Sequence, residues 1–330
     1  MIILDGQKPD SPCIATIGFF DGVHPGHRYL IRQVQQEARR KGMKSLIVSF
    51  SNHPRQVVHP EFIPRQLTTL PEKIDLLRST GADYLLLLPF TPALSQLTAK
   101  QFMQQILQEQ CHADTLFIGY DHRFGHNRCE GFSDYARYGR ELGLHIRRAE
   151  VLPPEAEEPL SSSLIRRTLQ AGDAAHAAHL LGRPYEVAGT VVRGMQLGRT
   201  LGFPTANIDY PIEKLIPADG VYAAAVSPAP DLPDPLHNQE GKTSQTLPPP
   251  FHEERLGVLN IGICPTMRSG EPVRTLEVHL PGYEGNLYGT RLRVRFLQRM
   301  REQQRFPSPE QLRAQLRIDV RTAQEMYPDL

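Results

Sequence analysis

Residues 15–31 read ATIGFFDGVHPGHRYLI and predict a strand, a tight turn and the start of a helix. The apolar run ends in a glycine and an acidic turn, and His24 and His27 follow with Pro25 and Gly26 between them. Proline suits the first helical position, because the N–H that it lacks would have no partner inside the helix. Glycine lets a ligand approach the backbone closely. The stretch therefore predicts a strand–turn–helix unit of an α/β fold.

The start of this helix is expected to bind phosphate. Backbone N–H groups of a first helical turn have no partner in the helix, and the helix dipole is positive there. His24 and His27 would add side-chain donors to the same place. Taken alone, an HxxH pair fits an ordinary turn with two surface histidines equally well.

Composition narrows the class of protein. The chain has 330 residues, enough for two domains. Its 37 basic and 36 acidic residues nearly cancel, so we expect neither a nucleic-acid partner nor a membrane partner. The four cysteines form no CxxC pair, which argues against a zinc site or a disulfide framework and favours a reducing cytoplasm. We expect no secretory leader and no membrane-spanning segment.

The first half alternates between short apolar runs and amphipathic segments, which predicts a doubly wound parallel sheet. The expected helices cover 27–41, closed by Gly42, then 71–80 and 99–111, and the expected strands cover 45–50, 84–88 and 115–118. Polar loops follow two of these strands, at residues 51–55 and 119–128. Open α/β sheets bind ligands at this carboxyl edge. In the second loop Arg123 and Arg128 offer forks for phosphate and Phe124 offers a ring face, although a charged surface loop is the alternative.

Four motifs in order, GFFDGVHPGH, NHPR, IGYDHRFG and SSSLIR, resemble the adenylyltransferase module of the bifunctional riboflavin kinase/FMN adenylyltransferase family, the prokaryotic FAD synthetases. The resemblance implies that His24 and His27 act on the ATP phosphates. It implies an ATP site of Gly18, Phe20, Asp21, Gly26, Ser162, Ser163 and Arg166, and an FMN site of Asn52, His53, Pro54, Asp121, Arg123 and Phe124. Phe19, Asn52 and His122 depart from the usual residues of the family.

From residue 185 the pattern changes to short alternating runs separated by Gly and Pro, which predicts an antiparallel β domain. We place the boundary at residue 182, with domains 1–182 and 183–330. In the extended segment 203–208, Thr205 and Asn207 share one face while Ala206 and Ile208 face the core. Their hydroxyl and carboxamide oxygens suit Mg²⁺ that carries nucleotide phosphates, although a plain turn into a strand explains them equally well.

The stretches GMQLGRTLGFPTAN, NIGICPT, TLEVHLPGYEGNLYG and REQQRF resemble the riboflavin kinase module of the same family, which implies a Greek-key β-barrel with a terminal helix. The resemblance implies that Glu277 is the general base and that Thr205 and Asn207 bind Mg²⁺. It also implies a kinase ATP site of Gly194, Gly198, Gly202, Pro204, Thr205 and Asn207, and a flavin site of Arg301, Gln303 and Phe306. Cys264 stands where Arg is usual, and Gln303 where Glu is usual.

Residues 227–254 are dense in proline and polar side chains, so we predict a mobile insertion in a hairpin. The closing helix, 309–327, is expected to pack on the barrel through Leu312, Leu316, Ile318 and Val320.

The sequence thus predicts phosphorylation of riboflavin to FMN, then adenylylation of FMN to FAD, in a monomer or weak homo-oligomer that uses ATP and Mg²⁺. Two alternatives stay open. One module, most plausibly the kinase, has lost its activity, or the chain is a flavin- or nucleotide-binding regulator without turnover.

Overall fold

The computed structural model describes residues 1–4, 7–58, 61, 65–120, 122–153, 159–230, 251–265 and 272–330. The chain divides into two compact units, Met1–Ser162 and Ser163–Leu330. Helix α8 (Ala174–Leu181) and all of helix α7 (Ser162–Gln170) after its first residue therefore group with the second unit. The domain boundary that we place at residue 182 stays a prediction.

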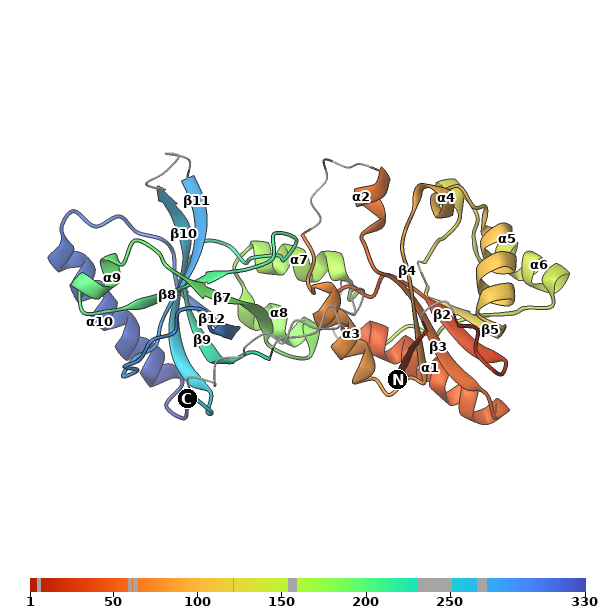
Figure 1. Cartoon of the computed structure of the whole chain (residues 1–330), viewed down its shortest axis with the longest axis horizontal. Helices are drawn as coiled ribbons and strands as arrows, with labels where there is room; N and C mark the ends of the chain where they lie inside the picture. The colour runs from red at the N-terminus through yellow and green to blue at the C-terminus, as the bar shows by residue number, and fades with distance from the viewer. Residues whose placement is uncertain are drawn as a thin grey trace. The chain divides into compact units, whose positions relative to one another are not determined.

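The first unit is built on a parallel sheet, as the alternation of apolar and amphipathic segments predicted (Figure 1). Its six strands lie in the order β1-β4-β3-β2-β5-β6. The strands are β1 (Ile2–Leu4), β2 (Cys13–Ile17), β3 (Lys44–Phe50), β4 (Tyr84–Leu88), β5 (Ala113–Ile118) and β6 (His145–Arg148). The chain runs from β2 outward through β3 to β4 and then returns to β5 on the other side of β2. Such a reversal opens a crevice at the carboxyl ends of the strands, where ligands bind.

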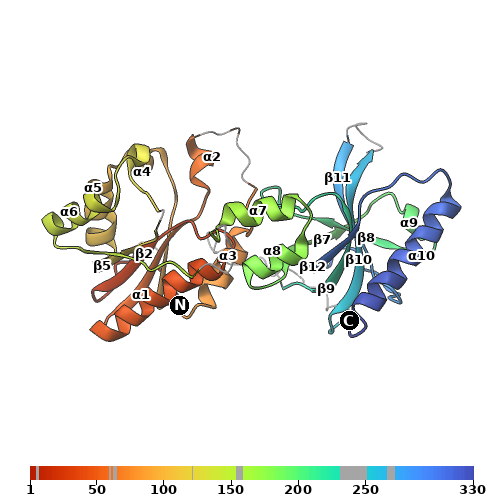
Figure 2. The same cartoon turned by 180° about the vertical axis from the view of Figure 1, so that it is seen from behind.

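Helices cover both faces of this sheet (Figures 1 and 2). They are α1 (Pro25–Lys41), α2 (Pro54–Val58), α3 (Leu70–Arg78), α4 (Pro92–Ser95), α5 (Ala99–Phe102), a π-helical segment (Met103–Gln110), a 3₁₀ turn (His126–Arg128) and α6 (Phe132–Leu142). Pro25 is the first residue of α1, and Gly42 ends the helix in the left-handed region with φ 65°, both as expected. Thr69 and Glu72 form a capping box that starts α3.

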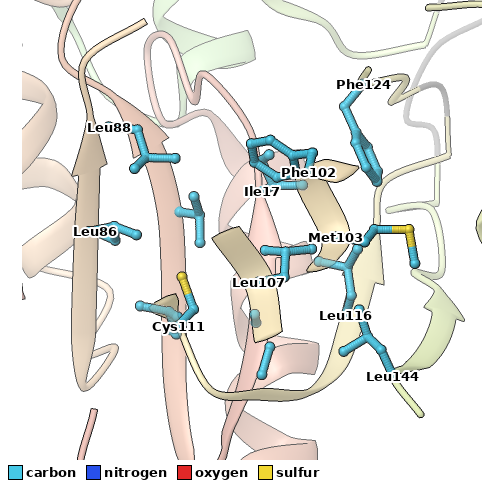
Figure 3. Packing of buried hydrophobic residues seen from close by; sticks show 14 of the residues in the cluster. Ile17, Leu86, Leu88, Phe102, Met103, Leu107, Cys111, Leu116, Phe124 and Leu144 are labelled. Atoms are coloured by element: carbon cyan, nitrogen blue, oxygen red, sulfur yellow. The ribbon is translucent and has the colours of Figure 1, made fainter. Parts of the chain in front are cut away.

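Side chains alternate along β2 between two cores, because successive residues of a strand face opposite sides. Cys13, Ala15 and Ile17 belong to the core under α5 and α6, whereas Ile14 belongs to the core under α1 and α3. Figure 3 shows the first core, in which the π-helical segment contributes Met103 and Leu107.

The helix predicted for 99–111 is therefore only partly an α-helix. It changes to π winding at Met103, and the N–H of Cys111 bonds to the carbonyl of Ile106, five residues earlier. Met103, Leu107 and Cys111 are spaced by four residues and are all fully buried. The wider π turn, at more than four residues per turn, lets residues at this spacing face the sheet together.

The second unit contains a closed antiparallel barrel, also as predicted, with strand order β10-β11-β8-β7-β12-β9 (Figure 1). Its strands are β7 (Tyr185–Val192), β8 (Thr205–Asp209), β9 (Gly220–Pro228), β10 (Arg255–Pro265), β11 (Pro272–His279) and β12 (Arg291–Arg301). Helix α9 (Leu197–Thr200) precedes β8.

The terminal helix α10 (Pro309–Met326) packs against this barrel, with Ala323 and Val320 beside Val258 of β10. One expected contact is wrong, because Ile318 is 47% exposed. Ile318 lies two positions from Leu316, about 200° around a helix. The neighbouring Asp319 takes the buried position instead, paired with Arg301 of β12.

The predicted insertion, 227–254, is anchored at both ends. Ser227 and Pro228 end strand β9. Phe251 is buried in edge contact with Tyr283, and Glu254 forms an ion pair with Arg295. Residues 231–250 lie outside the described residues, so the predicted mobility there stays a prediction. No described helix is long and apolar enough to cross a membrane.

Candidate active sites

The turn after β2 has an unusual backbone. Phe20, Gly22 and Val23 have positive φ angles of 54°, 79° and 40°. A β-branched residue such as Val23 rarely adopts this region, and each such residue costs about 1–3 kcal/mol unless the surroundings hold it. Strain of this kind concentrates at functional sites.

Asp21 holds the turn in place. Its carboxylate, in a residue only 3% exposed, accepts hydrogen bonds from the backbone N–H groups of Leu67 and Thr68, both at 3.0 Å, and from the Thr68 hydroxyl at 3.1 Å. Its carbonyl oxygen accepts a bond from the Ser162 hydroxyl at 2.9 Å. Asp21 thus joins the turn to the segment before α3 and to Ser162, the last residue of the first unit, whatever contact it makes with ATP.

The two histidines of the HPGH stretch stack on each other. Their ring centroids lie 3.7 Å apart at an interplanar angle of 21°. A Cβ on Gly26 would lie 3.2 Å from two ring atoms of His24, so only glycine leaves this ring its full space. The Phe20 ring meets His27 edge-on at 5.2 Å. The turn therefore presents a packed, pre-oriented pair of imidazoles at the start of α1.

Burial and the neighbouring rings of His24 and His122 lower the pKa of His27 well below its usual value. His122, which follows β5, has its pKa lowered to about 4 by burial and by Arg128. Within the described residues, His27 Nδ1 and His122 Nε2 are buried without a hydrogen-bond partner. His27 is therefore neutral near pH 7 and can donate through one N–H without carrying a positive charge.

The predicted FMN residues after β3 lie at the sheet edge. The Asn52 amide donates to the carbonyl of Phe90 at 3.0 Å and accepts from its N–H at 2.7 Å. His53 packs edge-on against Phe19 with centroids 4.8 Å apart, and Pro54 begins α2. Asn52 thus ties the end of β3 to the segment after β4, and contact with FMN stays a prediction for all three.

The loop after β5 differs from the expected open ring face. Phe124 is only 8% exposed and stacks on Tyr135, with centroids 4.3 Å apart and planes at 11°. Arg123 is exposed, and its carbonyl accepts a bond from Arg128 Nε at 3.2 Å. Asp121 lies outside the described residues. Phe124 has a packing role here, and its predicted contact with flavin stays a prediction.

Ser162 is the only predicted residue of the SSSLIR motif that belongs to the first unit. Ser163 is exposed and Arg166 is half-buried, and both lie on the part of α7 that groups with the second unit. Their part in binding ATP stays a prediction.

Gly18, which follows β2, has a structural role. A Cβ at this position would lie 3.0 Å from the Phe20 ring, so glycine leaves room for that ring.

In the barrel, neighbouring strands bring the predicted kinase residues together. Strand pairing sets Glu277 of β11 opposite Asn207 of β8 and opposite Asn260 of β10. The Thr205 hydroxyl lies 3.4 Å from Glu277 Oε2. Ala206 and Ile208 are buried, as the predicted alternation of β8 requires. Four oxygen-bearing side chains, those of Thr205, Asn207, Asn260 and Glu277, thus share one patch of the barrel surface.

The glycine-containing loop before β8 closes tightly on this patch. A Cβ on Gly194 would lie 2.3 Å from the Asn207 amide nitrogen, and one on Gly198 would lie 2.3 Å from the carbonyl of Phe203. Gly202 has a φ of 84°, which favours glycine. Pro204 is exposed, and its carbonyl lies 2.8 Å from His279 Nδ1. The loop approaches Asn207 because position 194 carries no side chain.

The predicted flavin residues of the kinase have structural partners. Arg301 forms two bonds to Asp319 at 2.9 and 2.7 Å, and its guanidinium lies 5.9 Å from the Phe306 ring centroid. The Gln303 amide donates to Asn260 Oδ1 at 2.5 Å and to the Ile261 carbonyl at 2.7 Å. A glutamate there would have no N–H for these two acceptors. The Gln303 amide group is therefore complementary to two hydrogen-bond acceptors on β10.

Sequence reasoning missed two residues near the sites. Lys73 is buried close to the turn after β2, and Asn260 lies between Glu277 and Gln303. Lys73 occurs in an ordinary amphipathic helix pattern, which gives no signal of burial. Asn260 belongs to the NIGICPT stretch, and its polar side chain within an apolar strand is a signal that could have found it.

Comparison with known protein families gives two matches, which cover different parts of the chain. Residues 6–164 match the family described as FAD synthetase, and residues 181–327 match the family described as riboflavin kinase. The first match covers the turn with His24 and His27, and the second covers the patch with Glu277.

Curated relatives match along nearly the whole chain. The bifunctional riboflavin kinase/FMN adenylyltransferase of Escherichia coli K12 is 35% identical over 97% of this chain and 95% of its own length. The enzyme of the same name from Pseudomonas fluorescens is 35% identical over 95% of this chain and 93% of its own.

One solved structure, titled a macrolide-efflux protein from Streptococcus pneumoniae, is 25% identical and superposes with a TM-score of 0.80 over 98% of both chains. Its title names a function that neither family match shares. The full-length sequence similarity and the two family matches agree with each other and with the two sites. The chain belongs to the bifunctional riboflavin kinase/FMN adenylyltransferase family.

Proposed function

We propose that the first unit transfers AMP from ATP to FMN, and that the barrel phosphorylates riboflavin with a second ATP. The observation that carries this proposal is that each unit has its own polar cluster, and that the two clusters differ in chemistry. One is a stacked pair of imidazoles at a helix start, and the other is a carboxylate beside two neutral oxygen ligands.

In the adenylyl transfer, a phosphate oxygen of FMN attacks the α-phosphorus of ATP, and the bond to the leaving pyrophosphate breaks. The nucleophile is already anionic near neutral pH, because the second pKa of a phosphate monoester is about 6. The site therefore needs alignment and charge stabilisation rather than a base. Neutral His27, whose pKa is lowered well below its usual value, is suited to donate a hydrogen bond to the phosphates as charge shifts.

In the kinase reaction, the 5′-hydroxyl of riboflavin attacks the γ-phosphorus of ATP and must lose its proton. Glu277 is the candidate base, since a positioned carboxylate can accept that proton. Thr205 and Asn207 offer hard oxygen ligands on the same side of β8, which fits Mg²⁺ with nucleotide phosphates. The metal would neutralise charge on those phosphates. The part of the chain that the structure describes holds no group of three His, Cys, Asp or Glu side chains suited to a metal.

The remaining residues are assigned by the same proposal. The ATP of the adenylyl transfer would contact Gly18, Phe20, Asp21, Gly26, Ser162, Ser163 and Arg166. FMN would contact Asn52, His53, Pro54, Asp121, Arg123 and Phe124. The kinase would bind ATP through Gly194, Gly198, Gly202, Pro204, Thr205 and Asn207, and flavin through Arg301, Gln303 and Phe306. We also propose a monomer or weak homo-oligomer that works in the cytoplasm without nucleic acid. The near balance of 37 basic and 36 acidic residues supports the absence of a nucleic-acid partner, and four cysteines without a CxxC pair fit a reducing cytoplasm.

The test is a product analysis of two variants. His27→Ala should abolish FAD formation from FMN and ATP while FMN formation from riboflavin continues. Glu277→Gln should do the reverse. The exposed His145 and Glu325 give matched controls, and His145→Ala and Glu325→Gln should retain both activities.

Two results would contradict the proposal. Loss of both activities from one substitution in a folded protein would refute separate sites. A wild-type protein that makes FAD from FMN but no FMN from riboflavin would instead show a silent kinase.

A further inference from the structure

Lys73 is an amine buried in the first unit, where it is only 2% exposed. It lies in the first turns of α3, four residues after the N-cap Thr69. This end of a helix carries the positive pole of the dipole, which disfavours a cation. Burial of an ammonium group without a full set of partners is also costly. Both the helix dipole and the burial of its charge therefore make Lys73 unfavourable for the stability of the first unit.

The partners of this ammonium are incomplete. Its Nζ donates to the carbonyl of Phe50 at 2.7 Å and lies 4.1 Å from the ring centroid of Phe19. An ammonium has three N–H donors. Within the described residues, the Phe50 carbonyl is the one hydrogen-bond acceptor recorded for it. A ring face supplies part of the missing interaction, as cation–π contacts do.

The charge of the Asp21 carboxylate favours the charged form of Lys73. Asp21 lies in the turn that leads to His24, and its carboxylate is buried there. A buried carboxylate beside a phosphate site repels the ligand unless a cation offsets it, because charges interact strongly away from water. Lys73 is placed to offset this charge.

The position of Lys73 in the sheet points to the ligand edge. Phe50 is the last residue of β3, and Phe19 follows the neighbouring strand β2. Phe19 contacts His53, and the next residue, Phe20, contacts His27. Lys73 thus lies against Phe19, which joins the turn after β2 to the loop after β3.

We propose that Lys73 is a positioning residue for phosphate in the adenylyl transfer, since its ammonium offsets the charge of Asp21 and makes this edge of the sheet accept phosphate oxygens. The inference rests on the proposed function of the first unit. The phosphate belongs either to FMN or to ATP, and the two sources differ in the kinetic constant that they affect.

Three substitutions separate charge from packing. Lys73→Gln keeps a donor for the Phe50 carbonyl and removes the charge, Lys73→Met removes both, and Lys73→Arg keeps the charge. Lys44→Gln is the matched control, because Lys44 lies exposed in the same unit and pairs with Asp83. Steady-state rates of FAD formation are measured with FMN and ATP varied in turn, and the reverse reaction is measured with pyrophosphate varied.

We expect Lys73→Gln and Lys73→Met to raise KM at least tenfold, with unchanged melting temperature or higher. Lys73→Arg should stay within threefold of the wild type. A rise in KM for FMN alone assigns the contact to the flavin phosphate, and a rise for ATP and pyrophosphate assigns it to the nucleotide. FMN formation by the barrel, in the same sample, should not change.

Wild-type KM values for all three substrates in Lys73→Gln would overturn the inference. So would a fall in FAD formation in all three variants that follows a fall in melting temperature, which would make Lys73 a purely structural residue. If the wild-type protein itself forms no FAD from FMN, the proposed function fails instead, and that result is separate from any effect of Lys73.

Discussion

The ionisation of Lys73 links one side chain to the stability of the first unit. Burial lowers its pKa from 10.5 to about 8, and the charge of Asp21 offsets this only in part. The folded state therefore binds fewer protons than the unfolded state between these two pH values. The stability of the folded state therefore rises as the pH increases from about 8 to 10.5. This gain in stability is lost as the pH falls back to about 8.

We predict that Lys73→Met is more stable than the wild type near pH 7, by up to about 3 kcal/mol, and that this advantage shrinks between pH 8 and 10.5. The reason is that methionine fills a similar volume and has no charge to bury. Denaturant unfolding of both proteins at several pH values measures the difference. A constant difference across this range would show that Lys73 keeps its proton in the folded state up to its ordinary pKa.

Single residues also show where reasoning from sequence patterns succeeds and where it fails. Ala206 and Ile208 are buried beside Thr205 and Asn207, because alternation is a property of any strand. Phe124 was expected to offer a free ring face, and its ring stacks on Tyr135 instead. Tyr135 is eleven residues away on α6, and the local sequence pattern does not predict that contact.

Among the elements, the turn between β2 and α1 depends most on distant partners. Its left-handed residues are held by the bonds that Asp21 makes to Leu67 and Thr68. The sequence predicts the turn and the helix start. It does not predict the anchor, because the two segments are 46 residues apart.

We predict that Asp21→Asn destabilises the first unit by about 2 kcal/mol, because the amide turns an N–H donor toward backbone donors. FAD formation should fall at least tenfold as the histidine pair loses its orientation, while FMN formation from riboflavin stays unchanged. Chemical unfolding and the two product assays measure these effects.

The matched control for the turn is Asp75→Asn on α3, where the partly exposed carboxylate forms an ion pair with Arg78. It should change neither stability nor FAD formation by a measurable amount, since exposed ion pairs contribute at most about 1 kcal/mol. Unchanged FAD formation in Asp21→Asn would show that the turn keeps its shape without the anchor.

At the scale of the whole molecule, each unit has a hydrophobic core of its own. Leu107 is fully buried in the core of the first unit, and Leu292 is fully buried in the barrel (Figure 3 shows Leu107). Loss of a buried leucine side chain to alanine costs about 2–5 kcal/mol. The two activities should therefore respond separately to such substitutions.

We predict that Leu107→Ala lowers the temperature at which FAD formation is lost, with little effect on FMN formation, and that Leu292→Ala does the opposite. Each serves as the control of the other, because the chemical change is the same. Residual activity after heating at a series of temperatures gives both values. Equal shifts of both activities in either variant would mean that the two units unfold together.

The sequence by itself determined the parallel sheet and the antiparallel β domain, because the periodicity of short segments already encodes their strands and helices. The barrel and the set of Glu277, Thr205 and Asn207 were expected from the resemblance of the motifs, and tertiary strand pairing brings these side chains together across 72 residues of chain. Only the tertiary structure decided that Asp21 anchors the turn, that Phe124 packs against Tyr135 and that Lys73 is buried behind Phe19. Burial, hydrogen bonding and charge at these positions are set by residues far away in the chain. Local sequence patterns do not show which distant residues will be in contact.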